Sequence, residues 1–241
     1  MTPLVLLPGP AVGLWTLVPA RHGDDDGGMT QVLSDLEGLY RARASTVDFI
    51  EVPKAWYLMV NGRGDPNGAE FQDAVHALYA VSFAAHFLVK RAQIDAPRVM
   101  PLEALWWFDD NRESELPVAL ARAVPQLGSA ERQHWCWRAM ILQLDPIDAL
   151  TVARATEQAA RKHLVALDRV RFEQWEEGRC AQTLHQGPFT DESTTILRLH
   201  ERIQSAGFRP HGRHHEIYLN DPHRTAPEKL RTILRHPISP A

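Results

Sequence analysis

The sequence is poor in cysteine, in net charge and in uninterrupted apolar segments. Cys136 and Cys180 are its only cysteines, too few for a disulfide framework and without a CxxC pair, which predicts a reducing, cytoplasmic location. The 26 basic residues do not outnumber the 30 acidic ones, so no direct nucleic-acid partner is expected. The apolar run at residues 4–20 is broken by proline and glycine and is too short to cross a bilayer as a helix, so no membrane partner is expected either.

Residues 1–28 differ in pattern from the rest of the chain. The apolar run lacks the basic start of a secretory signal, and the charged segment GDDDGG follows it. From Met29, MTQVLSDLEGLYRAR has the spacing of an amphipathic helix. We expect residues 1–28 to be a poorly ordered, dispensable extension and residues 29–241 to form one domain; the alternative is an extension that packs on the surface.

From Val47 onward, strand-like and helix-like segments follow the same order twice. In the first half, FIEVP and AWYLMVNGRG predict two strands, a helix follows Asp65, and VMPLEALWWF and WCWRAMIL predict two more strands. That helix has aromatic and aliphatic residues at helical spacing, namely Phe71, Val75, Leu78, Tyr79, Phe83 and Phe87.

The second half repeats this order. VRFEQWEEG and RCAQTLHQGPF predict a hairpin through the Glu-Glu-Gly turn, followed by a helix that ends at Gly207 with Ile196, Leu199 and Ile203 facing inward. HHEIYLNDP and LRTILRHPI then predict two strands. The sequence therefore predicts an α+β fold of tandem βαββ modules, at about residues 47–142 and 168–238.

Each module carries one glutamate in the strand after its helix, Glu103 and Glu216. A buried, unpaired carboxylate costs several kcal/mol, so such a residue is partnered, exposed or placed for a ligand. Alternation along a strand puts Glu103 on one face with Trp107, and Glu216 on one face with His214 and Tyr218. If the two sheets join edge to edge with both helices on one side, we expect both carboxylates to line a concave channel on the other side.

Structural interpretations of these residues remain open. Both carboxylates could pair with Arg138 or Arg213, and the tryptophans could be ordinary core residues. His214 and Glu216 could contribute to a metal site, but no third ligand can be named, so neither a metal nor another cofactor is expected.

Several segments in order resemble the GyrI-like small-molecule-binding family, in particular its stand-alone branch. These segments are FIEVPKAWYLMVNGRGDPNG, PLEALWW, WCWRAMILQLDP, HQGPFTDE, HHEIYLNDP and EKLRTILRHPI. The resemblance implies an SHS2-type fold with a pseudo-twofold axis, a curved antiparallel sheet, two long helices on one side, and a ligand channel between the helices and the concave sheet surface. Relatives include multidrug-sensing regulators and hydrolases that open the cyclopropane ring of yatakemycin- and duocarmycin-type alkylating compounds.

The resemblance and the chemistry of ring opening together assign roles to residues. Glu216 is the first choice for a general base and Glu103 the second, because an apolar site raises a glutamate pKa toward neutrality; Tyr57 or Tyr218 would donate to the substrate. The residues expected to bind the ligand are Trp106, Trp107, Trp135, Trp137, Tyr218 and His214.

We therefore expect a hydrolase for xenobiotic detoxification, acting on a hydrophobic or aromatic small molecule. The alternatives are a non-catalytic protein that binds or sequesters hydrophobic or cationic aromatic compounds, and an effector-sensing protein related to transcription. Only a short helix near residues 33–43 precedes the repeat, which argues against a self-contained transcription factor.

Overall fold

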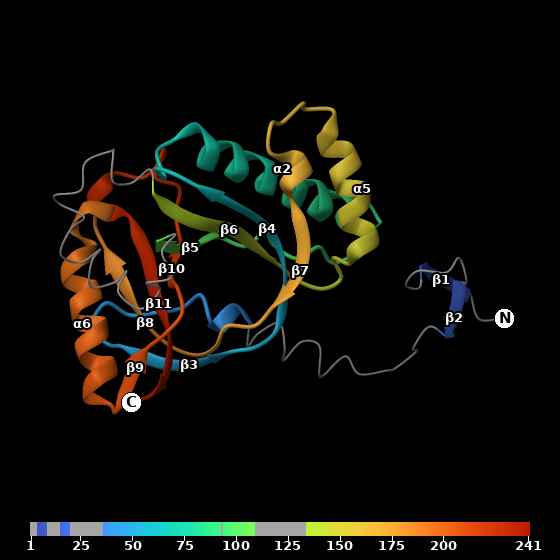
Figure 1. The fold of residues 1–241 in the computed structure, drawn as a ribbon. Helices are drawn as coiled ribbons and strands as arrows, with labels where there is room; N and C mark the ends of the chain where they lie inside the picture. The colour runs from blue at the N-terminus through green and yellow to red at the C-terminus, as the bar shows by residue number, and fades with distance from the viewer. Residues whose placement is uncertain (1–3, 9–14, 20–35, 93, 109–133) are drawn as a thin grey trace. The chain divides into compact units, whose positions relative to one another are not determined.

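The computed structural model describes residues 4–8, 15–19, 36–92, 94–108 and 134–241, which fall into two units (Figure 1). The first unit contains an antiparallel pair of strands, β1 (Leu4–Pro8) and β2 (Trp15–Pro19). This pair was not anticipated from the sequence, and the remainder of residues 1–28 lies outside the described residues. None of the described helices combines the length and apolarity needed to cross a membrane.

The second unit, from Leu36 to Ala241, contains the two expected βαββ modules. The first module consists of β3 (Asp48–Val52), β4 (Ala55–Arg63), α2 (Ala69–Arg91), β5 (Leu102–Phe108) and β6 (Trp135–Gln143). The second consists of β7 (Arg171–Trp175), β8 (Gly178–Gln186), α6 (Glu192–Ser205), β10 (His214–Tyr218) and β11 (Arg231–Pro240). The described part of the unit also contains a short strand, β9 (Phe208–Pro210), and the 3₁₀ turns η1 (Leu167–Arg169), η2 (Phe189–Asp191) and η3 (Pro227–Lys229).

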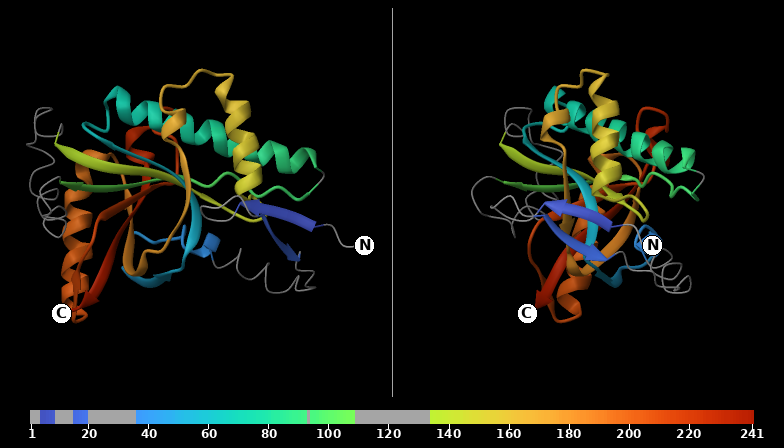
Figure 2. Two further views of the ribbon diagram at one scale, coloured as in Figure 1. Left: turned by 45° about the vertical axis from the view of Figure 1, so that its right-hand side comes forward. Right: turned by 90° about the vertical axis from the view of Figure 1, so that its right-hand side faces the viewer.

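A helix that was not predicted, α5 (Ala149–Ala160), separates the modules and packs on α2 (Figure 2). Asp148 caps it by accepting a 2.8 Å hydrogen bond from the Thr151 amide. The aspartate three residues before a threonine was therefore an available signal for the start of this helix.

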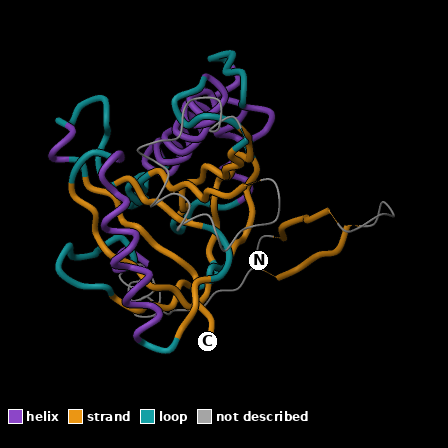
Figure 3. The backbone as a smooth tube through the Cα atoms, turned by 60° about the vertical axis from the view of Figure 1, so that its left-hand side comes forward, coloured by secondary structure: helices purple, strands orange, loops and turns teal. Residues whose placement is uncertain are grey.

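One antiparallel sheet contains the described strands of this unit, in the order β3-β8-β11-β10-β5-β6-β4-β7, with β9 paired to β11. Hairpins β5–β6 and β10–β11 lie within the modules, and the ladder between β5 and β10 joins the modules edge to edge. The strands curve around the unit, with helices outside them (Figure 3). The expected α+β fold with a curved antiparallel sheet is therefore confirmed.

β7 and β8 do not form the expected hairpin. β7 pairs with β4 and β8 pairs with β3, so residues 48–63 and 171–186 are two bent segments that run side by side in one register. The bend at Glu176 and Glu177 lies opposite the bend at Pro53 and Lys54. Gly178, with φ of 73°, permits such a bend as well as a tight turn, which is why its sequence was misinterpreted.

The two long helices cover the outer face of the sheet, α2 over β4 and β6, and α6 over β8 and β11 (Figure 1). Ile196, Leu199 and Ile203 of α6 are buried, as expected, and Gly207 follows its end with φ of 79°. This left-handed conformation is readily available to glycine.

The buried face of α2 was predicted only in part. Ala74, Ala77 and Ala85 have no exposed surface, whereas Phe83 and Phe87 are 47% and 46% exposed. An alanine-lined face lets the helix approach the sheet closely, so small residues rather than the large aromatic ones form this contact.

Gly62 on β4 tests the close packing of the outer face. A Cβ atom at this position would overlap the ring of Trp137, which has no exposed surface. We expect Gly62→Ala to lower the free energy of unfolding by about 1–3 kcal/mol, because overpacking displaces the indole. Urea denaturation measures this loss against Gly38→Ala, where nothing lies within 4 Å of the added carbon. Equal stability of the two variants would contradict the packing described.

Deletion of residues 1–28 tests the proposed division of the chain. We expect the Tm of the shortened protein to equal that of the full chain, because the second unit begins at Leu36 and has its own core. Differential scanning calorimetry of both proteins measures the difference. A large fall in Tm would show that the extension stabilises the domain.

Candidate functional site

The ladder between β5 and β10 determines which predicted site residues lie together. Glu103 pairs with Ile217 and Ala104 pairs with Glu216, so the two carboxylates occupy neighbouring rungs and point to opposite faces. The expectation that both line one channel is therefore wrong. Alternation within each strand was read correctly, but only the register between the strands fixes which faces coincide.

The inner cluster is a network of buried polar side chains on the concave face: Tyr40, Glu103, Glu177, Gln182, His215 and Arg235. Tyr40 donates a 2.5 Å hydrogen bond to Glu103, and His215 lies 3.0 Å from Glu103 through Nε2 and 3.0 Å from Glu177 through Nδ1. Arg235 donates to Glu177 at 3.3 Å, to Gln182 at 3.0 Å and to the Leu39 carbonyl at 2.8 Å. The charged side chains are at most 1% exposed.

The charges of the inner cluster compensate one another. Burial disfavours ionisation of Glu177, but His215 and then Arg235 outweigh it and hold the Glu177 pKa below its usual value. Burial also disfavours protonation of His215, but Glu177 and Glu103 outweigh it and raise the His215 pKa. The buried acids of the inner cluster are therefore partnered, and the partners of Glu103 are His215 and Tyr40 rather than the arginines considered from the sequence.

Two further predicted residues lie on the inner face. Tyr57 is 2% exposed, and burial followed by the charge of Glu103 raises its pKa. Its ring meets Trp175 edge-on at 5.6 Å between centroids. Trp107 is farther along β5, where the Arg213 guanidinium lies 3.7 Å from its ring centroid. The inner face thus collects Glu103, Tyr57 and Trp107.

The outer cluster lies where the first turn of α6 meets the sheet and consists of Glu192, His214, Glu216, Tyr218 and Thr232. The Tyr218 hydroxyl donates a 2.7 Å hydrogen bond to Glu216, and His214 Nε2 lies 3.4 Å from the other carboxylate oxygen. The side chain of Glu216 is 14% exposed, whereas those of Glu103 and Glu177 in the inner cluster are 0% and 1% exposed.

Aromatic rings adjoin the outer cluster. Phe189 meets Tyr218 edge-on at 5.7 Å, and the Trp106 indole adjoins the Tyr218 hydroxyl. Trp106 lies 5.3 Å from Phe71 of α2 and 5.8 Å from Trp135, as measured between ring centroids. The outer face thus collects Glu216 together with Trp106, Trp135, Trp137, Tyr218 and His214.

Glu192 and Thr232 are the members of the outer cluster that sequence reasoning did not identify, and Glu192 is the titratable one of the two. Glu192 is the first residue of α6, a position at which an exposed acidic residue suits the helix dipole. The residue is instead 5% exposed, because it precedes buried Ile196 and Leu199 at helical spacing on the same face of α6. Burial, and then the charge of Glu216, raise the Glu192 pKa well above its usual value. Helical spacing was therefore the signal that could have found it.

Several buried polar atoms around the outer cluster lack hydrogen-bond partners within the described part of the chain: Glu192 Oε1, Thr232 Oγ1, His214 Nδ1 and Trp106 Nε1. Buried polar atoms in folded proteins are usually paired, so such a gathering indicates a place for a polar ligand or water. The described residues contain no group of three or more metal-binding side chains, and His214 and Glu216 have no third ligand there.

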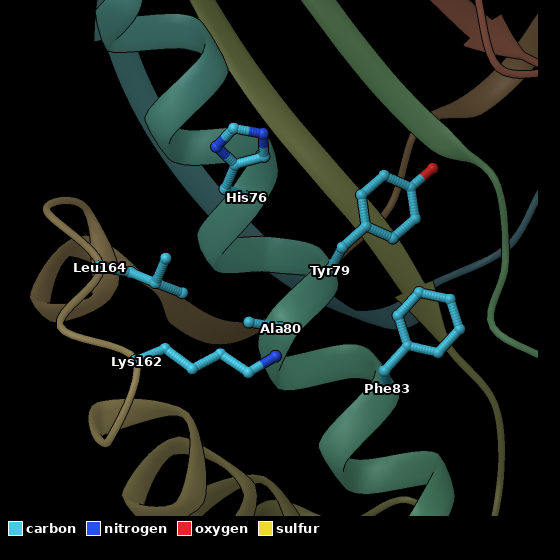
Figure 4. Close-up of a pocket in the computed structure, with 6 residues that line it drawn as sticks. All are labelled: His76, Tyr79, Ala80, Phe83, Lys162 and Leu164. Atoms are coloured by element: carbon cyan, nitrogen blue, oxygen red, sulfur yellow. The ribbon is translucent and has the colours of Figure 1, made fainter. Parts of the chain in front are cut away.

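A separate pocket of about 300 Å³ lies between α2 and the segment after α5 (Figure 4). Its lining residues are His76, Tyr79, Ala80, Phe83, Lys162 and Leu164. The rings of Tyr79 and Phe83 point away from Lys162, so its polar groups do not converge on one point. Convergent polar groups are typical of ligand sites, and the outer cluster is therefore the stronger candidate.

Comparisons with known proteins agree with this fold. Residues 45–239 match the model of the GyrI-like small molecule binding domain. An uncharacterized conserved protein from Listeria innocua is 32% identical, with a TM-score of 0.72 over 86% of this chain and 98% of that chain. A hydrolase from Listeria innocua is 32% identical, with a TM-score of 0.69 over 86% of this chain and 98% of that chain. No curated protein matches the chain.

Glu177→Gln tests whether the inner cluster is structural. The substitution leaves His215 and Arg235 without their shared carboxylate, so we expect the free energy of unfolding to fall by about 3–5 kcal/mol at neutral pH. The lowered Glu177 pKa implies that this loss shrinks as pH falls through that pKa, because wild type then loses the same charge. Denaturation at several pH values, with exposed Glu176→Gln as control, measures it. A loss equal to the control's would contradict the role.

Proposed function

The chain belongs to the GyrI-like small-molecule-binding family, and on that premise we propose that it is a hydrolase opening the cyclopropane ring of yatakemycin- and duocarmycin-type alkylating compounds. The observation that carries this proposal is the partly exposed carboxylate of Glu216, held by Tyr218 beside aromatic rings. The hydrolase from Listeria innocua, 32% identical over 86% of this chain, supports an enzymatic role.

The reaction adds one water molecule to a strained ring. The water oxygen bonds to the methylene carbon of the cyclopropane, and the ring carbon–carbon bond breaks. The electron pair of that bond moves into the conjugated dienone, whose oxygen becomes a phenolate and then takes up a proton. The proton lost by water needs a base, and a positioned carboxylate typically contributes a factor of about 10²–10⁴ to the rate.

Glu216 is the base in this proposal, because water can reach it and Tyr218 fixes its orientation. Glu103 and Tyr57, the other two candidates, are 0% and 2% exposed in the inner cluster. Glu103 is already held by Tyr40 and His215, and Tyr57 lies beside Glu103 in the same buried cluster, so we assign Glu103 and Tyr57 to structural roles. Trp106 and Phe189 would contact the flat indole rings of such a substrate.

Non-catalytic binding of a hydrophobic cation is the second candidate function. The same features favour it, because a carboxylate beside Tyr218 and Phe189 attracts a cation through both its charge and the ring quadrupoles. The two functions differ in turnover, since a binder protects at most one equivalent of ligand.

The test is a chromatographic time course of a duocarmycin-type compound with purified protein. We expect wild type to form more than one equivalent of ring-opened product, and Glu216→Gln to lower kcat about a hundredfold while leaving binding within a few-fold. Glu201→Gln, an exposed change on α6, is the matched control. Stoichiometric protection without product would overturn the hydrolase proposal in favour of binding, and full activity of Glu216→Gln would exclude Glu216 as the base.

A further inference from the structure

The outer cluster contains a second carboxyl group for which the reaction described above has no role. Glu192 enters from the first turn of α6, whereas Glu216 enters from β10. The charge of Glu216 acts on Glu192, and the charges of both groups act on Tyr218. Glu192 is 5% exposed, and the side chain of Glu216 is 14% exposed. Two groups of one chemical type therefore occupy different environments at the same place.

The surroundings of Glu192 favour its neutral form. In the described part of the chain, the polar groups that act on its carboxyl are the anionic Glu216 and the hydroxyl of Thr232, whereas His215 and Arg235 act on Glu177. A buried carboxyl beside a carboxylate keeps its proton, because two like charges at low dielectric repel each other. A neutral carboxyl is a hydrogen-bond donor, and its Oε1 atom has no partner among the described residues.

We propose that Glu192 is the proton donor of the reaction, acting on the dienone oxygen while Glu216 accepts the proton of water. The inference rests on the proposed hydrolase function. Glu192 then gives a proton to the oxygen that receives the electron pair, and Glu216 takes a proton from the water that attacks the ring carbon. Neighbouring carboxyl groups that differ in protonation divide the roles of acid and base in this way.

The proton balance closes over one turnover. As the ring bond breaks, the dienone oxygen gains negative charge and takes the Glu192 proton, which gives a phenol. Water loses one proton to Glu216 and its oxygen becomes the hydroxyl of the product. Glu192 is then ionised and Glu216 protonated, and one proton passing from Glu216 to Glu192 restores the starting state without any further reactant.

A donor that must carry a proton predicts a definite pH dependence. Activity should be lost as pH rises through the raised pKa of Glu192, because ionised Glu192 has no proton to give. Other titratable groups share this region. On the same face of the strands beneath α6 they are His214, Glu216, Tyr218, His236 and His185, and on η2 and α6 themselves they are Asp191, Arg198 and His200. A variant that removes only the Glu192 proton separates its contribution from theirs.

Glu192→Gln is that variant, because an amide keeps the shape and a hydrogen-bond donor but transfers no proton. We expect its kcat to be about a hundredfold below wild type and its fall of activity at high pH to disappear. Glu192→Ala should lose more activity, because it also removes the hydrogen bond to the oxygen. Asp191→Asn, the exposed neighbouring acid, is the matched control and should keep the wild-type pH profile.

Infrared spectroscopy gives a readout independent of turnover. At neutral pH, the difference spectrum of wild type and Glu192→Gln should contain the carbonyl band of a protonated carboxylic acid; a carboxylate band instead would overturn the inference. Turnover by wild type with an unchanged rate and pH profile in Glu192→Gln would overturn this inference alone. No turnover by wild type would overturn the proposed hydrolase and, with it, the donor role.

Discussion

The antiparallel ladder between β5 and β10 is the contact on which the rest of the molecule depends. It joins the two modules into one sheet, and it places Glu103 and Glu216 on neighbouring rungs with opposite orientations. Consecutive residues of β10 therefore lie on opposite faces of the sheet: His215 is on the inner face and Glu216 is on the outer face. Because Glu103 and Glu177 hold His215 from the inside, the backbone that carries Glu216 is fixed before any ligand arrives.

The two clusters show how surroundings decide the behaviour of one side-chain type. Glu177 and Glu192 are both buried glutamates, yet the pKa of the first is lowered and that of the second is raised. Glu177 faces His215 and Arg235, whereas Glu192 faces another carboxylate. The charged groups of the inner cluster contact one another, whereas the outer cluster keeps polar atoms that have no partner among the described residues. The inner cluster thus has the paired charges expected of a structural network, and the outer cluster has polar groups that a ligand could contact.

Local pattern was sufficient for most elements and for the tandem modules, because strand and helix periodicities are set by neighbouring residues. Features that depend on pairing between segments far apart in the chain could not be predicted from the sequence. The β7–β8 hairpin was wrong because Gly178 fits a bend and a turn alike, and the common face of Glu103 and Glu216 was wrong because register joins strands far apart in sequence. The aromatic residues of α2 also misled, because alanines rather than Phe83 and Phe87 contact the sheet.

The missing site residue has a different explanation. Glu192 begins a helix, and acidic residues at helix starts are so common that a capping role is the natural interpretation. Its spacing to Ile196 and Leu199 indicated an inward side chain, but a sequence does not show that Glu216 lies beneath that turn. Conversely, the glutamate in PLEALWW attracted a catalytic role because its partners, Tyr40 and His215, are remote in the chain.

The way the modules are joined also affects the protein during synthesis. The last strand of the first module ends at Gln143. When this residue has been synthesised, β10, the strand that pairs with β5, has not yet been made. Until then β5 presents an unpaired edge with the sequence LEALWWF, which is apolar enough to pair with other nascent chains. Glu103 lies within that edge, and its unpaired charge disfavours such contacts. The carboxylate that lies beside His215 in the finished fold is thus the one charged group within the edge that β10 later covers.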